Sequence, residues 1–341
     1  MTEGRGTEGR APSSSPARSS PHPASPTPPP VLPPRILVTG ANGLVGQALA
    51  RAAGRWRGAD VLATGRRPAL ALGGFAGGTA ALDVTDADAV ERLLQDFAPD
   101  VVLHAAGLAQ VEACEADREA CWALNVEATA ALAAACHRHG ARLVLPSTDF
   151  VFDGERGPYA EDARPAPLTH YGRTKLAAEN ALKASRLTRW AVARTTLVFG
   201  APAGPAPRLD FVRWLVRELG AGRPVRVPDD QVRTPTYDED FADGVLRVVR
   251  FGKSGTFHVA GREVLTTYAL ALRVAEAFDL DAGLVAPTTT AALHPGAPRP
   301  LKAGLLILRA ETELGYRPRP LDAALADLRG RLGVPRPSAR R

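Results

Sequence analysis

Three features of the 341-residue sequence predict an α/β fold built on a doubly wound parallel sheet. Short apolar runs alternate with amphipathic segments from residue 35 to about residue 200. The apolar runs lack the in–out alternation of a half-exposed strand, which is typical of parallel strands covered on both faces. A glycine-rich turn joins the first apolar run to the first amphipathic segment, and this strand–turn–helix order is how such a sheet begins.

The order of the elements follows from the same runs. We expect six strands, at 36–39, 60–64, 80–82, 101–104, 141–146 and 190–195. Apolar positions at helical spacing predict helices at 44–53, 87–97, 118–137 and 171–184. From about residue 200 the pattern becomes irregular and rich in Pro and Arg. We therefore expect a nucleotide-binding domain over 35–200, then a smaller, mainly substrate-binding region over 201–330 that is interleaved with the last strands.

The two ends of the chain differ from this body in composition. Residues 1–34 contain ten of the thirty prolines, with many small residues, and predict a disordered tail. Residues 331–341 contain four arginines and no acid, and predict a basic tail. Of the formal net charge of +6, these ends hold +1 and +4, so residues 35–330 hold only +1. A nearly neutral body argues against a basic face that binds nucleic acid.

Composition excludes several other classes. No run approaches the roughly 20 apolar residues that span a bilayer. The cysteines are Cys114, Cys121 and Cys136, an odd set without a Cys-x-x-Cys pair, so we expect small buried or half-buried residues rather than a disulfide scaffold or zinc site. His137 and His139 lack an acidic or cysteine partner, so no metal site is expected. The N-terminus has no secretory signal, and we expect a cytoplasmic protein.

The glycine-rich turn lies in the run ILVTGANGLVG, at residues 36–46. Gly40, Gly43 and Gly46 can serve a tight turn, the close approach of backbone to a pyrophosphate, and close packing of helix on strand. The helix N-terminus would face the phosphates with its free N–H groups. A plain turn is the alternative, but the strand before it and the helix after it favour a dinucleotide. The expected contacts are Gly40, Asn42, Gly43, Leu44 and Gly46.

Arg66 and Arg67 follow the second strand, where an acid would hold the ribose 2′-hydroxyl of NAD. Two arginines suit a 2′-phosphate, so NADP(H) is favoured over NAD(H), although two solvated surface arginines are the alternative. At the next two strand ends, further cofactor contacts are expected. These are Asp83 and Val84 after the third strand, and Ala105, Ala106 and Gly107 after the fourth.

Tyr171 and Lys175 are four residues apart at the start of a predicted helix, which places a phenol beside an ammonium on one face. A cation there favours the phenolate, so we expect Lys175, together with the positive charge of an oxidised nicotinamide, to lower the pKa of Tyr171. Such a phenol can act as a proton donor to a carbonyl oxygen. A chance pair on a solvated helix is the alternative. It is weakened because the chain has only four lysines among its 42 basic residues. Thr148, after the fifth strand, is placed to orient the carbonyl, although a Ser/Thr pair after a strand can equally be a helix cap or turn.

The motifs GANGLVG, HAAGLAQVEACE, ALNVEAT, STDFVFDGERGPY, APLTHYGRTKLAAE and DDQVRTPTYDEDFAD occur in this order over about residues 35–330. Together they resemble the extended short-chain dehydrogenase/reductases, and within these the dTDP-4-dehydrorhamnose reductase family. The resemblance implies a Rossmann-type fold whose C-terminal part holds a nucleotide sugar. It implies catalytic roles for Thr148, Tyr171 and Lys175, with Asn125 in the active-site helix.

Three residues are expected on the substrate side. Phe150 stands where the family often has Tyr, Arg233 lies just before a family Pro-Thr pair, and Arg299 belongs to a family Arg-Pro pair. Residues 301–308 depart from the family's usual Ser-x-Leu-Asp run. These departures concern the identity of the sugar nucleotide more than the chemistry.

The resulting hypothesis is an NADPH-dependent reductase of a 4-keto nucleotide sugar, with a homodimer as a possible assembly. One alternative is an epimerase or dehydratase that retains bound NAD. The other is a non-catalytic NADP-binding regulatory subunit like that of methionine adenosyltransferase, whose sequence resembles this chain around STDFVFDG.

Overall fold

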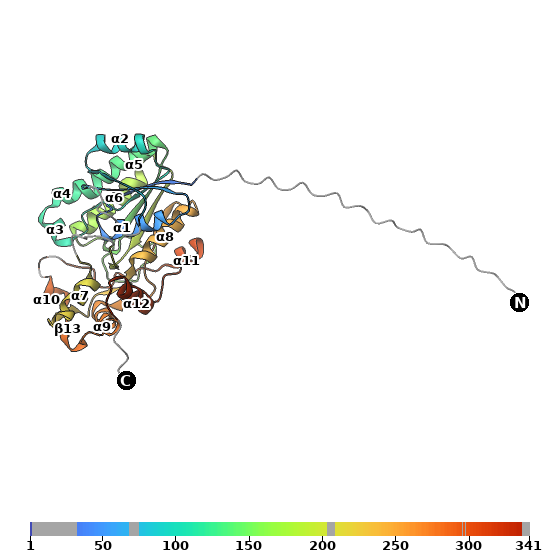
Figure 1. Cartoon of the computed structure of the whole chain (residues 1–341). Helices are drawn as coiled ribbons and strands as arrows, with labels where there is room; N and C mark the ends of the chain where they lie inside the picture. Colours follow the sequence, from blue (N-terminus) through green and yellow to red (C-terminus); the bar gives the residue numbers. More distant parts are fainter. Residues whose placement is uncertain (2–32, 68–74, 203–208, 295, 297, 336–341) are drawn as a thin grey trace. The chain divides into compact units, whose positions relative to one another are not determined.

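The structure, a computed structural model, describes residues 1, 33–67, 75–202, 209–294, 296 and 298–335 (Figure 1). The chain divides into a unit of residues 1–32 and a unit of residues 33–341, and the fold below is that of the second unit. The predicted disordered tail therefore lies almost entirely outside the described residues.

In the described part of the chain, seven strands form one parallel sheet in the order β11–β6–β5–β4–β1–β2–β3. All six expected strands are present within two residues of their predicted ends, and β11 adds a seventh beside β6. The strand order reverses at β1, which lies between β2 and β4, and ligands bind at such a reversal. The strands are β1 (Arg35–Thr39), β2 (Asp60–Gly65), β3 (Gly78–Ala81), β4 (Val101–His104), β5 (Arg142–Thr148), β6 (Trp190–Thr195) and β11 (Gly255–His258).

Helices cover both faces of this sheet, as its continuous apolar strands predict (Figure 1). Successive residues of β1 show the two faces, since Leu37 packs in one core cluster while Ile36 and Val38 pack in the other. The Leu37 face is covered by α2 (Ala87–Phe97), α5 (Ala128–His139) and α6 (His170–Ala184). The opposite face is covered by α1 (Leu44–Gly54), α8 (Asp238–Arg250) and α11 (Leu308–Leu314).

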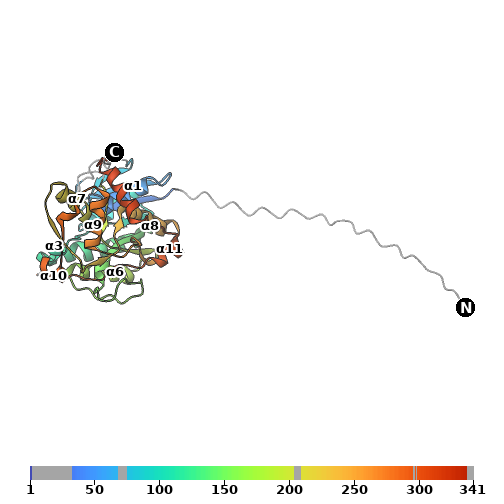
Figure 2. The same cartoon turned by 90° about the horizontal axis from the view of Figure 1, so that it is seen from below.

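A third core cluster lies in the C-terminal region, among α7 (Phe211–Gly220), α9 (Thr267–Ala277) and α12 (Leu321–Arg331). Figure 2 shows α7 and α9 next to each other there. Short strand pairs complete the region. They are β7 (Val198–Phe199) with β10 (Thr236–Tyr237), β9 (Val232–Arg233) with β12 (Leu265–Thr266), and β8 (Val225–Pro228) with β13 (Val285–Thr288). This region also contains the short helices η3 (Ala282–Leu284) and α10 (Thr290–Leu293), and a further short helix, η2 (Asp149–Val151), follows β5.

The helix expected at 118–137 is not continuous. It consists of α4 (Arg118–Trp122), a π-helical turn η1 (Ala123–Glu127) and α5, and a further short helix, α3 (Val111–Ala116), precedes it. Asp117 separates α3 from α4, because its carboxylate accepts from the amide of Ala120 and caps α4. Asn125 lies in the π-helical turn, a feature found frequently at functional sites.

The cysteines differ from expectation in one respect. All three are fully buried, but Cys114 and Cys121 are joined by a disulfide, with their Cα atoms 5.2 Å apart, and Cys136 alone is free. The prediction that disulfides play no part was therefore wrong for this pair. The pair was missed because Asp117, which ends α3 and caps α4, was not recognised as a break between two helices.

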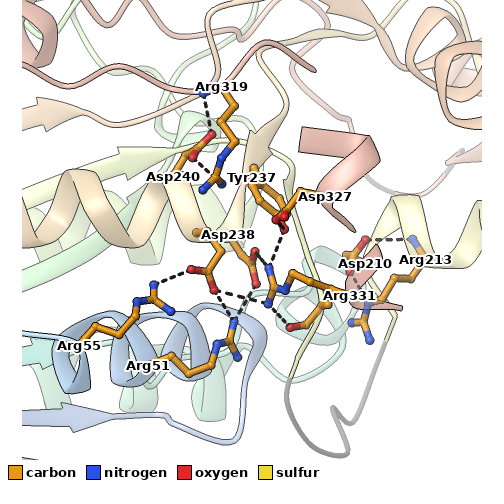
Figure 3. A network of polar contacts seen from close by, with 12 residues as sticks. Arg51, Arg55, Asp210, Arg213, Tyr237, Asp238, Asp240, Arg319, Asp327 and Arg331 are labelled. Atoms are coloured by element: carbon orange, nitrogen blue, oxygen red, sulfur yellow. Dashed lines mark hydrogen bonds and ion pairs between the residues drawn. The ribbon is translucent and has the colours of Figure 1, made fainter. Parts of the chain in front are cut away.

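The basic tail predicted from residue 331 is also corrected. Arg331 is the last residue of α12, and Val334 packs against the third core cluster. Residues 336–341 lie outside the described residues. Arg331 belongs to a polar network with the N-terminal end of α8 (Figure 3). Its guanidinium donates to the hydroxyl of Tyr237 at 2.7 Å and to Oδ1 of the fully buried Asp238 at 3.0 Å.

The same network reaches α1, the helix that follows β1 (Figure 3). Arg51 of α1 lies 3.3 Å from Oδ2 of Asp238 and 3.1 Å from Oε1 of Glu239. Arg55, one turn later, bonds the other oxygen of Glu239 at 2.6 Å. Arginines of α1 and α12 thus meet on two adjacent carboxylates at the start of α8.

Among the described residues, no helix is long and apolar enough to cross a membrane.

Candidate active site

The glycine-rich loop follows β1 and begins α1, as predicted. Gly40 has φ +70°, and a Cβ there would lie 2.4 Å from the amide nitrogen of Ala106, so this position requires glycine. A Cβ on Gly46 would lie 2.2 Å from the carbonyl oxygen of Gly40. Gly43 is different, because a Cβ there would lie 3.5 Å from its nearest neighbour, the carbonyl oxygen of Gly40, which is an ordinary contact distance. Gly40 and Gly46 therefore shape the loop, whereas Gly43 leaves space at the helix N-terminus where a phosphate can approach.

Asn42 and Leu44 belong to the same loop. The carboxamide of Asn42 lies over Gly65 at the end of β2, where a Cβ would be 1.8 Å from its Oδ1. Leu44 is the first residue of α1, directly after the Gly43 cap. The loop is thus in contact with the strand end that precedes Arg66 and Arg67.

Arg66 and Arg67 are exposed at the end of β2. Asp83, after β3, accepts hydrogen bonds from the hydroxyl and amide of Thr85 at 2.7 and 3.0 Å. These bonds lower the pKa of Asp83, and the charge of Arg66 lowers it further, so the structure brings Asp83 and Arg66 together. Val84 is buried in the core, so only its backbone can face a cofactor.

The end of β4 lies beside the glycine loop. The amides of Ala105 and Ala106 donate to the carbonyl and hydroxyl oxygens of Thr39, at 3.2 and 3.4 Å. The same hydroxyl is 2.8 Å from Nδ1 of the buried His104. Burial lowers the pKa of His104 to about 3, and the charge of Lys175 contributes, so this imidazole is neutral. It acts in the structure as a strand-end residue that fixes β4 to β1.

Gly107 and Leu108, which follow, are held by Asn125. The carboxamide of Asn125 accepts from the amide of Leu108 at 2.8 Å and donates to its carbonyl at 3.0 Å. A Cβ on Gly107 would lie 3.0 Å from Oδ1 of Asn125. The same carboxamide nitrogen is 3.0 Å from Oγ1 of Thr174. Asn125 therefore fastens the segment after β4 to helix α6, through a side chain that is 2% exposed.

Thr148, Tyr171 and Lys175 come together at the carboxyl end of β5. Thr148 is the last residue of β5, and Tyr171 and Lys175 lie in the first two turns of α6. Thr169 caps this helix by accepting from the amide of Gly172 at 3.0 Å. The ammonium of Lys175 donates to the carbonyl of Pro146 at 2.8 Å. These contacts orient both side chains toward the β5 end.

The pKa values of the pair are those of the protein without cofactor. Burial raises the pKa of Tyr171 to about 12, a hydrogen bond with Thr148 lowers it, and the charge of Asp149 raises it. The expected lowering by Lys175 is thus absent in the protein alone. Burial lowers the pKa of Lys175 to about 8, while the charge of Glu179 raises it. A phenol protonated at neutral pH is the form that a proton donor requires.

Glu179 was missed by sequence reasoning. Its fully buried carboxylate is held by Arg194 of β6 at 2.9 and 2.7 Å and by the hydroxyl of Ser147 at 2.6 Å. Although burial alone would raise it, the hydrogen bond and charge of Arg194 lower the pKa of Glu179. Because Glu179 follows Lys175 by one helical turn, an ionised carboxylate lies below the ammonium. A charged arginine inside an otherwise apolar strand was the available signal.

The three predicted substrate-side residues occupy two places. The ring of Phe150 packs edge-on to Tyr171 at 5.7 Å, and the guanidinium of Arg233 lies over Phe150 at 5.7 Å. Arg233 is itself buried, and its guanidinium bonds other groups of the protein. It pairs with the buried Asp149 at 3.3 Å and donates to the carbonyl of Pro300 at 2.7 Å. Asp149, another residue missed from the sequence, thus connects the carboxyl end of β5 to Arg233.

Arg299 lies nearby, since its charge lowers the pKa of Arg233 further after the effect of burial. Its guanidinium pairs with Glu112 of α3, and His294, just after α10, lies 3.6 Å from the same carboxylate. Figure 2 shows α3 and α10 as neighbours. Within the described residues, no group of three or more His, Cys, Asp or Glu side chains could hold a metal ion.

Comparison with known proteins agrees with this geometry. Residues 34–332 match the family described as RmlD substrate binding domain. The dTDP-4-dehydrorhamnose reductase of Mycobacterium tuberculosis is 35% identical over 272 residues, which are 78% of this chain and 82% of that protein. Methionine adenosyltransferase 2 subunit beta of Pongo abelii is 31% identical over 290 residues, 82% of each chain.

A solved structure has the same fold. The dTDP-4-dehydrorhamnose reductase of Bacillus anthracis, in complex with NADP, superposes with a TM-score of 0.74 at 25% identity, over 87% of this chain and 98% of that chain. The chain thus belongs to the RmlD substrate binding domain family and, with the dTDP-4-dehydrorhamnose reductases, to the NAD(P)-dependent oxidoreductases of the extended short-chain dehydrogenase/reductase type.

Proposed function

We propose that this protein is an NADPH-dependent reductase of a 4-keto nucleotide sugar. The observation that carries the proposal is the meeting of Thr148, Tyr171 and Lys175 at the carboxyl end of β5, on the sheet edge that also carries the glycine-rich loop. The dTDP-4-dehydrorhamnose reductases at 35% and 25% identity support the reaction class.

The chain's own residues suit a dinucleotide. Gly43 leaves the N-terminus of α1 open to a pyrophosphate, and Gly40 and Gly46 bring strand, loop and helix close together. Arg66 carries the positive charge expected for an adenosine 2′-phosphate. When bound, NADPH would supply the hydride that reduces the keto carbon.

Proton donation falls to Tyr171. Its raised pKa keeps the phenol protonated until the carbonyl oxygen gains negative charge, and it then gives its proton to that oxygen. The ammonium of Lys175 stabilises the phenolate that remains. Thr148, whose hydroxyl donates to Asp149 at 3.2 Å in this structure, would turn this bond toward the carbonyl and orient it. Asn125 keeps Gly107 and Leu108 fixed at the edge where the nicotinamide would lie.

The test is NADPH oxidation over a panel of dTDP-, GDP- and UDP-linked 4-ketosugars, monitored at 340 nm with product sugars identified by mass spectrometry. Tyr171→Phe should lower turnover by about 10²- to 10⁴-fold and leave NADPH binding intact. Tyr268→Phe, which removes the phenol hydroxyl of a tyrosine on α9, is the matched control. Full turnover by Tyr171→Phe would contradict the role of the phenol.

Cofactor choice has its own test. Arg66→Ala and Arg67→Ala should each weaken NADPH more than NADH, since only NADPH carries the 2′-phosphate. Equal losses for both cofactors would place the arginines outside the 2′-phosphate site.

A second candidate is a regulatory, cofactor-binding subunit, favoured by the 31% identity to methionine adenosyltransferase 2 subunit beta. It predicts NADPH binding without turnover over the whole panel, together with co-purification of a partner enzyme. An epimerase or dehydratase would instead release tightly held NAD on denaturation. The expected homodimer and cytoplasmic location stay predictions, which sedimentation and cell fractionation test.

A further inference from the structure

Two cysteines adjoin Asn125 and the segment at Gly107 and Leu108 that Asn125 holds. Cys114 of α3 and Cys121 of α4 are both fully buried and are joined by a disulfide. Their Cα atoms are 5.2 Å apart, within the range that a disulfide bridges without backbone movement. The third cysteine, Cys136 of α5, is buried and free, so the chain contains its own reference thiol.

Each sulfur of the pair adjoins an acceptor that Asn125 uses. Sγ of Cys114 lies 3.5 Å from the carbonyl oxygen of Leu108, and Sγ of Cys121 lies 3.5 Å from Oγ1 of Thr174. The carboxamide nitrogen of Asn125 donates to both of these oxygens, at 3.0 Å each, and lies 3.4 Å from Sγ of Cys121. The sulfurs and Asn125 therefore share one small network.

Reduction changes this network chemically. A disulfide sulfur carries no proton and only accepts, whereas a thiol is also a weak donor. Two thiols would bring new donors to the carbonyl of Leu108 and the hydroxyl of Thr174, in competition with Asn125. The two sulfurs would also have to separate from bonding to van der Waals distance in a fully packed interior, which displaces α3 relative to α4.

Helix α3 transmits such a displacement to the rest of the site. Glu115 accepts from the amide of His170 at 2.7 Å, and His170 is the first residue of the helix that carries Tyr171. Glu112 pairs with Arg299 on the expected substrate side. The disulfide thus stabilises the positions of two carboxylates that contact opposite parts of the site.

We propose that Cys114 and Cys121 form a reversible redox-modification site that sets the rigidity of the active-site edge from Leu108 to Cys121. Two thiols react with a low-molecular-weight disulfide such as oxidised glutathione. A mixed disulfide forms first, and the second thiol then displaces the remaining glutathione. One protein S–S bond forms, and the small disulfide is reduced to two thiols, which take up both protons and both electrons. Neither the site nor its chemistry depends on the identity of the ketosugar.

The experiment uses the full-length protein equilibrated in millimolar oxidised glutathione or in millimolar dithiothreitol. Both sulfurs are buried, so exchange requires local opening of the six-residue helix α3, and equilibration is followed to completion. Alkylation under denaturing conditions, followed by mass spectrometry, should find one thiol in the oxidised sample, at Cys136, and three in the reduced sample. Three thiols in the oxidised sample would overturn the proposal.

Hydrogen exchange then tests the coupling. The amides of Leu108 and His170 should exchange at least about tenfold faster in the reduced sample, while core strand amides of β1 stay unchanged. Equal rates for Leu108 and His170 in the two samples would also overturn the proposal. This wild-type comparison needs no variant to fold and no turnover, so its failure is distinct from failure of the proposed function.

Variants sharpen the assignment. Cys114→Ala removes the disulfide but retains the sulfur of Cys121 beside Asn125, and it should exchange at the fast rate in both buffers. Cys136→Ser is the matched control, and it should retain the full difference between buffers. A Cys114→Ala variant that keeps the slow rate would show that the disulfide does not stabilise this edge.

Discussion

Arg331, the final residue of α12, allows a quantitative test of the network at the start of α8 (Figure 3). In Arg331→Met, Asp238 loses a partner at 3.0 Å while its side chain stays fully buried. Removing one member of a buried ion pair costs about 3–5 kcal/mol. Arg331 is 24% exposed and Arg51 remains 3.3 Å from Asp238, so we expect a loss of about 2–3 kcal/mol in the free energy of unfolding.

Urea denaturation followed by circular dichroism measures this loss. The matched control is Arg262→Met, which removes an ion pair with Glu311 through a side chain that is 63% exposed. Exposed pairs contribute about 0–1 kcal/mol, so the control should change little. A loss for Arg331→Met no larger than that of the control would refute the reasoning.

The pH dependence gives a second check on the same variant. Burial raises the pKa of Asp238 to about 6, and the charge of Arg331 opposes this rise. A carboxyl whose folded-state pKa is raised favours the folded state when protonated, and this benefit is lost as pH rises through about 6. Without Arg331 the pKa rises further, so the deficit of Arg331→Met should be larger at pH 7.5 than at pH 5. The double variant with Asp238→Asn should recover part of the stability at pH 7.5.

Three further predictions concern the site. Because the pKa of Lys175 is about 8, turnover should fall above that pH as the ammonium loses its charge. Lys175→Arg should turn over more slowly, but the pH above which its turnover falls should be higher. If rate measurements find this alkaline limb of the pH profile unmoved, the assignment is contradicted. Gly46→Ala should lower the melting temperature because its Cβ would lie 2.2 Å from a carbonyl oxygen. Gly43→Ala should keep the melting temperature and weaken NADPH binding, which fluorescence measures. An equal fall in melting temperature for the two variants would contradict the different roles of the two glycines. Glu179→Gln should lower the free energy of unfolding by about 3–5 kcal/mol, because Arg194 loses its ion-pair partner. It should also shift the alkaline limb of turnover to lower pH, because the charge of Glu179 raises the pKa of Lys175. A purely structural role would not produce this shift.

The sequence predicted best those features whose chemistry is local in the chain. The glycine-rich loop, with strand before and helix after, and the Tyr171–Lys175 spacing each lie within a dozen residues, and the structure places both on one sheet edge. In the protein alone the pKa of Tyr171 is raised, and the spacing shows the nearby cation but not the loss of solvent that outweighs it.

Features that depend on distant partners could not be predicted. In the sequence, Arg331 is one of several arginines in a basic segment. Only the fold shows that it pairs with Asp238, which lies 93 residues earlier. Glu179 was missed because its partner Arg194 lies on another element, and the position of that arginine inside an apolar strand indicates a buried acid without saying which one. The break at Asp117 combines a capping residue with a short helix, and such a helix is too brief to show a clear period.

The network in Figure 3 also bears on the order in which the protein can be completed. Arg51 lies on α1, its acidic partners are Asp238 and Glu239, and the arginine that completes the network, Arg331, follows Arg51 by 280 residues. During synthesis, therefore, α1 can meet its acidic partners as soon as α8 is made, whereas the network at the start of α8 is complete only after Arg331 has been added. Until then, the buried Asp238 has the guanidinium of Arg51 but lacks that of Arg331.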